Sequence, residues 1–115
     1  MGCTIEMPYD EYNVGTTCYC RVHVCNTDTV PFTDVPVFVI LDVYGTLFFA
    51  PSFSAFDYYA DPIPPGMSTI DVLPEFPWPA GAGEAYGINF YAAMTNPEMT
   101  ELLGEMDMIT FGWNS

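Results

Sequence analysis

Three cysteines and the single histidine of the chain stand close together, in the pattern Cys18-x-Cys20-x-x-His23-x-Cys25. Thiolate and imidazole groups are ligands that zinc prefers, so the residue types alone allow a zinc site. In an extended strand, however, successive side chains point to opposite faces, which separates Cys18 and Cys20 from the other two. All four would converge only if the strand bent. The spacing therefore favours disulfides over a metal centre.

A fourth cysteine near the start of the chain makes the set even. An even number of cysteines in a short domain is typical of a disulfide framework formed outside the cell. Four cysteines allow three pairings, and the sequence does not choose among them. We therefore predict an extracellular or cell-surface protein with one or two disulfides among Cys3, Cys18, Cys20 and Cys25.

Catalytic patterns are weak in this sequence. A Cys–His pair needs a third group to orient the imidazole, and His23 lies among the predicted disulfide cysteines. The sequence has no Gly-x-Ser-x-Gly elbow, P-loop or dinucleotide-binding motif. Two of the carboxylates could still form a glycosidase pair, but that chemistry needs a cleft that a domain of this size rarely builds. We predict that the protein is not an enzyme and has no catalytic residues.

Carboxylates in the expected loops make calcium a candidate ligand, because calcium prefers hard oxygen ligands at loop positions. None of the groups follows the EF-hand pattern, and a solvated acidic rim explains any one of them. The shortage of basic residues nevertheless favours at least one bound calcium ion. The candidate ligands are Asp28, Asp34, Asp57, Asp61, Glu101, Glu105 and Asp107.

Aromatic residues form a second group of candidates. Aromatic rings beside carboxylates can hold a sugar, anchor another subunit or simply fill a core. The residues that we predict to bind a ligand or a partner are Phe53, Phe56, Tyr58, Tyr59 and Trp78.

Charge excludes several classes of partner. The chain of 115 residues has 15 acidic residues, one arginine, no lysine and a net charge of −14. Binding to nucleic acid or to an anionic membrane surface requires a basic patch, which this composition cannot supply. The most hydrophobic run, residues 35–50, is interrupted by Pro36, Asp42 and Gly45, so we predict no membrane insertion. The length suits one domain.

Alternation and turn residues predict a mostly β fold. Residues 16–25 alternate strictly, which indicates a strand with one buried face. Residues 37–41 are continuously apolar, as expected for a strand that is covered on both faces or lies at a subunit contact. Asn96 as a cap and Pro97 at the first helical position predict one short helix, which would end at Gly104. Further strands are expected over residues 46–49, 68–73, 85–95 and 107–113.

A resemblance to a known family supports this prediction. Residues 35–113 contain VPVFVILDVYGTLFFAPSF, LPEFPWPAGAG and FYAAMTNPEMTELLGEMDMITFGW. These stretches resemble an immunoglobulin-like domain found near the C-termini of secreted or surface-anchored bacterial proteins. The resemblance implies an adhesive or structural role and provides no catalytic residues.

Together these observations predict a single immunoglobulin-like β-sandwich over residues 1–115, with residues 1–15 as an N-terminal arm or donor strand. The leading functional hypothesis is an extracellular structural subunit that assembles with identical copies into an oligomer or polymer, stabilised by calcium. The alternative is a secreted module that binds carbohydrate or protein.

Overall fold

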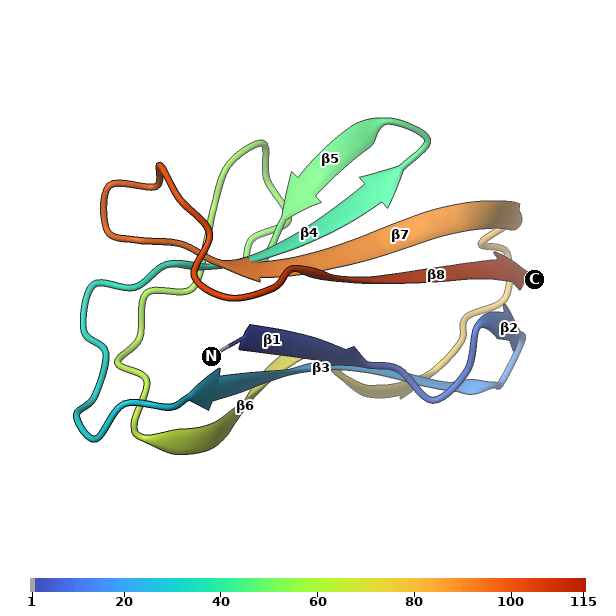
Figure 1. The fold of residues 1–115 in the computed structure, drawn as a ribbon. Helices are drawn as coiled ribbons and strands as arrows, with labels where there is room; N and C mark the ends of the chain where they lie inside the picture. Colours follow the sequence, from blue (N-terminus) through green and yellow to red (C-terminus); the bar gives the residue numbers. More distant parts are fainter. Residues whose placement is uncertain (1) are drawn as a thin grey trace.

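The computed structural model describes residues 2–115 and shows two packed β-sheets (Figure 1). Within this range no helix occurs that could span a membrane. The strands are β1 (Gly2–Glu6), β2 (Glu11–Asn13), β3 (Thr17–Asn26), β4 (Val37–Val43), β5 (Thr46–Phe49), β6 (Gly66–Pro77), β7 (Glu84–Met94) and β8 (Asp107–Asn114).

The smaller sheet has the strand order β1-β3-β6, with all pairs antiparallel. Its central strand β3 alternates between buried and half-buried residues after Thr17, as its sequence predicts. Cys18, Cys20, Val22 and Val24 are each at most 1% exposed and face the other sheet. The prediction of a strand with one buried face is therefore confirmed, and the structure shows that the buried face is that of Cys18 and Cys20.

The larger sheet has the order β2-β8-β7-β4-β5. Its β2–β8 pair is parallel and its other pairs are antiparallel. The first residues of the chain thus contribute one strand to each sheet, because β1 pairs with β3 and β2 pairs with β8. This order, with the first strand divided between two facing sheets, is that of an immunoglobulin-like sandwich.

Aromatic and aliphatic side chains from both sheets fill the core. Tyr12 is fully buried and stacks on Trp78 with the ring centroids 5.3 Å apart. Its hydroxyl donates a 2.8 Å hydrogen bond to the backbone oxygen of Tyr9, so the polar end of the ring has a partner. Phe90 and Phe111 stack at 5.6 Å between β7 and β8.

The short helix predicted over residues 96–104 is absent, and a tight turn stands in its place. The Asn96 side chain does accept backbone hydrogen bonds, at 2.8 Å from Thr100 and 3.0 Å from Glu101. The chain then reverses, because Met99 has a φ of 59° and Leu102 pairs back with Thr95. A side chain that caps a helix can equally close a turn, and here it closes a turn.

All four cysteines, which lie within the described residues, are free thiols rather than the predicted disulfides. Cys18 and Cys20 are two residues apart on β3 and both face the core. Cys25 lies on the opposite face of the same strand and is half-buried. Burial raises the pKa of both Cys3 and Cys20 to about 12, which keeps these thiols protonated at neutral pH.

Candidate interaction surface

An apolar row crosses the outward side of the larger sheet. In the strand registers, Met108 of β8 lies opposite Tyr91 of β7, Tyr91 lies opposite Ile40 of β4, and Ile40 lies opposite Phe49 of β5. All four side chains point away from the core, because their neighbours in sequence point inward. Met108 is 53% exposed. We call these four residues the outer row.

Two further rows flank the outer row on the same face. On one side Ala93 lies opposite Phe38. On the other side the row consists of Thr110, Asn89, Asp42 and Leu47. We call the three rows together the outer face.

The loop after β5 adds aromatic rings to this surface. Phe56 and Tyr58 lie 5.9 Å and 5.4 Å from the ring of Phe38, measured between centroids. Phe56 also lies 5.6 Å from Phe49 and is 60% exposed. Adjacent strands and the loop therefore build one aromatic cluster that is open to solvent on one side.

Local hydrogen bonds hold this loop in place. Ser54 and Phe49 exchange backbone hydrogen bonds of 2.8 and 3.3 Å, which returns the chain to β5. The Asp57 carboxylate accepts hydrogen bonds from the backbone amides of Ser52 and Tyr58. Hydrogen bonding, first from the Ser52 side chain and then from the Tyr58 amide, lowers the pKa of Asp57 and favours its ionised form. The Asp57 carboxylate thus stabilises the conformation of the loop beside the aromatic cluster.

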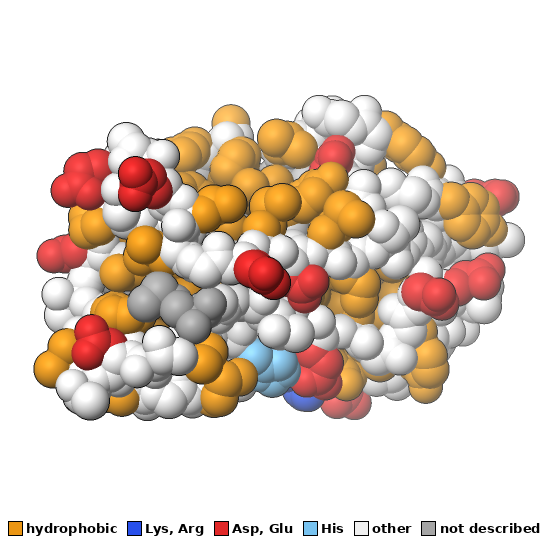
Figure 2. Space-filling model, in the orientation of Figure 1, with side chains coloured by type: hydrophobic (Ala, Val, Ile, Leu, Met, Phe, Trp, Pro, Cys, Tyr) orange, Lys and Arg blue, Asp and Glu red, His pale blue; other side chains and the backbone are white. Residues whose placement is uncertain are grey.

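The outer face carries little charge. Asp42 is the one acidic residue in the three rows, and its carboxylate accepts a 2.8 Å hydrogen bond from the amide of Gly45. Figure 2 shows hydrophobic side chains gathered over β7 and above it, with acidic side chains at both ends of the molecule and also just below and above this group. In a chain with a net charge of −14, a largely apolar region with so few carboxylates is a candidate contact surface.

The outward side of the smaller sheet differs in chemistry. The Nε2 atom of His23 donates a 2.7 Å hydrogen bond to Glu6, and the Tyr19 hydroxyl donates one of 2.9 Å to the same carboxylate. These two bonds, His23 first, lower the pKa of Glu6. Arg21 lies 3.7 Å from Glu6 and 3.4 Å from Asp71. The single histidine and the single arginine of the chain thus lie beside acidic groups (Figure 2).

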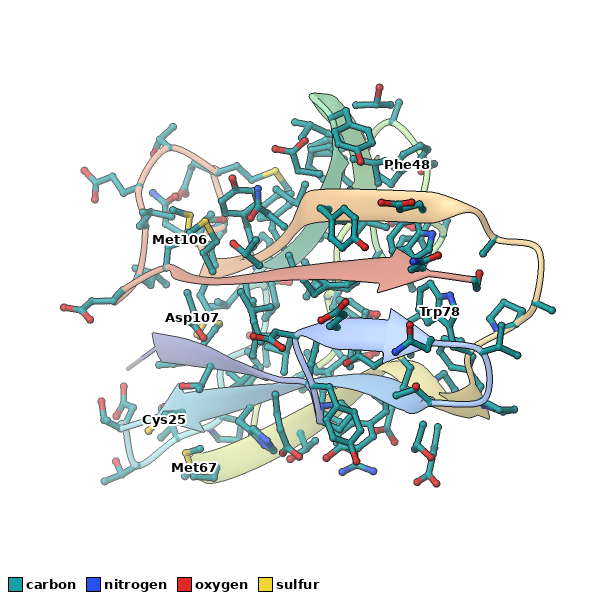
Figure 3. The ribbon with its side chains drawn as sticks, turned by 90° about the vertical axis from the view of Figure 1, so that its right-hand side faces the viewer. Cys25, Phe48, Met67, Trp78, Met106 and Asp107 are labelled. Atoms are coloured by element: carbon teal, nitrogen blue, oxygen red, sulfur yellow. The ribbon has the colours of Figure 1, made fainter. Side chains whose placement is uncertain are left out.

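The predicted calcium ligands do not come together. Within residues 2–115, no three Asp, Glu, His or Cys side chains form a group that could hold a metal ion. Asp107 instead bridges the two sheets, because its carboxylate accepts a 2.8 Å hydrogen bond from the amide of Ile5 (Figure 3). Exposed loop or turn positions hold Asp28, Asp34, Asp61, Glu101 and Glu105.

The structure also divides the predicted binding aromatics. Phe56 and Tyr58 join the cluster described above, whereas Phe53, Tyr59 and Trp78 pack against the core. Burial raises the pKa of Tyr59, consistent with its inward position. The indole nitrogen of Trp78 is buried and has no hydrogen-bond partner within the described chain. The predicted binding loop therefore presents two of its aromatic residues together on the surface.

The predicted site residues included no member of the three rows, and Phe38, Ile40, Tyr91 and Met108 illustrate the reason. For the first two a signal was present, since an unbroken apolar run at 37–41 predicts either two covered faces or a subunit contact. Tyr91 and Met108 join this surface because of the register between strands that lie far apart in the sequence, which no local pattern predicts.

Two solved structures are similar to this chain. One is the crystal structure of the CARDB domain of the PF1109 protein from Pyrococcus furiosus, in complex with di-metal ions. It has a TM-score of 0.51 and 19% identity, over 97% of this chain and 88% of that chain. The solution NMR structure of the same domain has a TM-score of 0.51 and 20% identity, over 97% and 92%. This similarity shows a shared fold. No family model and no curated protein matches the sequence.

Proposed function

We propose that this chain is an extracellular, non-catalytic interaction module that associates with copies of itself through the outer face. The observation that carries the proposal is the outer row, in which four apolar residues from four strands stand in register on the outward side. A sheet needs one apolar face for its own core, and a second apolar face is typical of a contact with another molecule.

Charge supports a second copy as the occupant. Two molecules that each carry a net charge of −14 repel one another in most orientations. Repulsion is weakest where carboxylates are fewest, and the outer face carries Asp42 alone in its three rows. A two-fold contact between outer faces would also bury Phe56 and Met108, which are 60% and 53% exposed in the single chain.

The extracellular placement rests on the resemblance to secreted and surface-anchored domains described above. The acidic surface agrees with it, because it provides no basic patch for nucleic acid or anionic lipid. We assign no catalytic role to the single histidine, since Glu6 and Thr69 lie within 2.7 and 3.0 Å of its two ring nitrogens on an open sheet face. Both ring nitrogens of His23 thus have hydrogen-bond partners within the chain, and neither is free to act as a general base.

Calcium has no resident site in this proposal, because the described residues form no metal-binding group within one chain. Divalent cations should still favour association by screening the carboxylates. We therefore expect calcium and magnesium at equal concentration to strengthen association equally. A strong preference for calcium, measured by sedimentation with and without a chelator, would instead require a site formed between copies.

Carbohydrate binding remains the second candidate, and one feature favours it. Phe56 is exposed, and the Ser54 hydroxyl lies 3.3 Å from its backbone oxygen and 2.7 Å from the Ser52 hydroxyl, so these hydroxyls could hydrogen-bond a sugar stacked on the ring. Binding of an oligosaccharide library to a monomeric chain, lost in Phe56→Ala, would favour this function over self-association.

The test of self-association is a matched pair of variants at Met108. Met108→Glu places a carboxylate in the outer row, where Met108→Gln places a neutral group of similar size. We expect association to weaken about 30-fold or more for the glutamate and only a few-fold for the glutamine, because a charge must be desolvated at the contact. Equal association of both variants and the unmodified chain, measured by analytical ultracentrifugation, would overturn the proposal.

A further inference from the structure

The four sheet edges of the sandwich differ in how well they are closed. Strand β2 has three residues and β5 has four, and the end of β5 is already paired with Ser54. On β1, the amide of Ile5 donates to Asp107 and Gly2 pairs with Glu105. Short or covered edges of this kind resist pairing with another chain.

Strand β6 is the exception. It is 12 residues long and lies at the edge of the smaller sheet, paired with β3 on one side. Its last four residues are protected by Pro74, Glu75 and Pro77, which disfavour pairing with a further strand. Its first eight residues, 66–73, contain no proline, so an open edge remains there.

The one acidic charge in residues 66–73 is offset by a basic side chain on the neighbouring strand. Asp71 is the sole ionisable residue of 66–73, and Arg21 on the neighbouring strand lies opposite it, with Nε 3.4 Å from the carboxylate. Arg21, the one arginine of the chain, thus offsets the negative charge of Asp71. Without it, that charge would repel a second acidic chain at this edge. For a protein with a net charge of −14, this edge offers another copy an approach with little repulsion.

A space also lies behind the edge. A cavity of about 170 Å³ separates β6 from the segment at residues 59–63, and Val24, Val37 and Ile63 contribute to its wall. The hydroxyl of Ser68 lines it and is buried without a hydrogen-bond partner. The cavity is large enough to hold a water that would give this hydroxyl a partner, so it is the open edge itself that favours a contact.

We propose that residues 66–73 pair antiparallel with the same residues of a second copy, joining two three-stranded sheets into one of six strands. Since paired residues must point to the same face, a register centred on Thr69 places Met67 opposite Asp71 of the other copy and keeps the two Asp71 carboxylates apart. As in the proposed function, the partner is a second copy of this chain, but the contact is made by the edge of the smaller sheet and not by the outer face. Two such two-fold contacts on one domain would generate a linear polymer.

Met67 allows a matched test, because it is 66% exposed and points outward near the start of this edge (Figure 3). Met67→Glu should weaken the edge contact about tenfold or more, whereas Met67→Gln should change it little. Met67→Lys should strengthen it beyond Val30→Lys, which adds the same charge on an exposed loop. Equal behaviour of the two lysine variants would contradict the register.

The decisive experiment combines both surfaces in sedimentation equilibrium on the full chain, with circular dichroism to confirm folding. We expect polymers for the unmodified chain, dimers for Met108→Glu, dimers for Met67→Glu and monomers for the double variant. In the Met108→Glu dimer, backbone amide exchange over residues 66–73 should slow as concentration rises.

A monomeric Met108→Glu variant, or a dimer in which that exchange is unchanged, would overturn the edge contact alone. A monomeric Met67→Glu variant beside a dimeric Met108→Glu variant would instead overturn the outer-face contact and leave the edge contact standing. A monomeric unmodified chain would overturn both.

Discussion

The outward sides of the two sheets follow opposite principles. On the smaller sheet, Glu6 collects hydrogen bonds from His23 and Tyr19, and Arg21 lies between two carboxylates. On the larger sheet, apolar side chains stand in register and the charged residue Asp42 is bonded to its own turn. One side satisfies its polar groups within the chain and the other leaves apolar area without a partner. This difference is the basis of our proposal that the larger sheet provides the contact.

The largest expected contrast concerns thiol chemistry. Cys25 lies on the outward side of the smaller sheet, whereas Cys3, Cys18 and Cys20 are buried. We expect a maleimide to modify Cys25 in the folded chain at least about 1,000-fold faster than the other three, because those require opening of the core. Mass spectrometry after timed labelling measures the rates. Failure to label any cysteine even in urea would show disulfides and contradict the free thiols.

Matched aromatic truncations sharpen the comparison between the two sides. Phe56→Ala removes an exposed ring of the outer face, and Tyr19→Ala removes a ring from the polar side. We expect the outer-face contact to weaken about tenfold in the first and to change less than about twofold in the second. The measurement is sedimentation equilibrium in the Met67→Glu background, which isolates this contact. A larger effect of Tyr19→Ala than of Phe56→Ala would place the contact on the smaller sheet and contradict the proposal.

Asp42→Asn tests the role of charge at the outer face. The asparagine oxygen can still accept the hydrogen bond from Gly45, so the turn should persist. Removing two facing carboxylates per dimer should tighten association about two- to threefold at low salt and less at high salt. Light scattering across a salt series would detect the change, and a salt-independent effect would point to the turn instead.

The smallest expected effect is the pH dependence contributed by Glu6. Its pKa in the folded state is lowered, chiefly by the hydrogen bond from His23. A carboxyl group with a lowered folded pKa stabilises the fold above its unfolded pKa of 4.5 and loses that contribution as pH falls through the folded value. Glu6→Gln should therefore lower the free energy of unfolding at pH 7, and the difference from the unmodified chain should shrink toward acid pH. Urea unfolding at several pH values measures it, and a constant difference would exclude this linkage.

Parts of the fold were predictable because they depend on local pattern. Strand β3 alternates so strictly that a strand with one buried face could be predicted from sequence. The turn at Asn96 could not, because an asparagine followed by proline and acidic residues begins a helix as readily as a turn. What decided it was the pairing of Thr95 with Leu102, a contact outside local propensity.

The candidate surface was predictable only in part for a related reason. The apolar run in β4 predicted a strand that is covered on both faces or lies at a subunit contact, and Phe56 and Tyr58 were expected to bind. Met108 joins them through the pairing of β8 with β7 and of β7 with β4, which no local pattern specifies. The disulfide prediction was wrong because it rested on the number of cysteines. In the structure, strand alternation points Cys25 away from the buried Cys18 and Cys20 on β3.

The most direct test of the central claim is hydroxyl-radical footprinting as a function of protein concentration. Met108 and Phe56 report on the outer face, and Tyr9, which is 55% exposed elsewhere, serves as the internal control. We predict that oxidation of Met108 and Phe56 falls as the chain associates while that of Tyr9 stays constant. Association that leaves Met108 and Phe56 as reactive as in the monomer would contradict the assignment of the outer face as the contact surface.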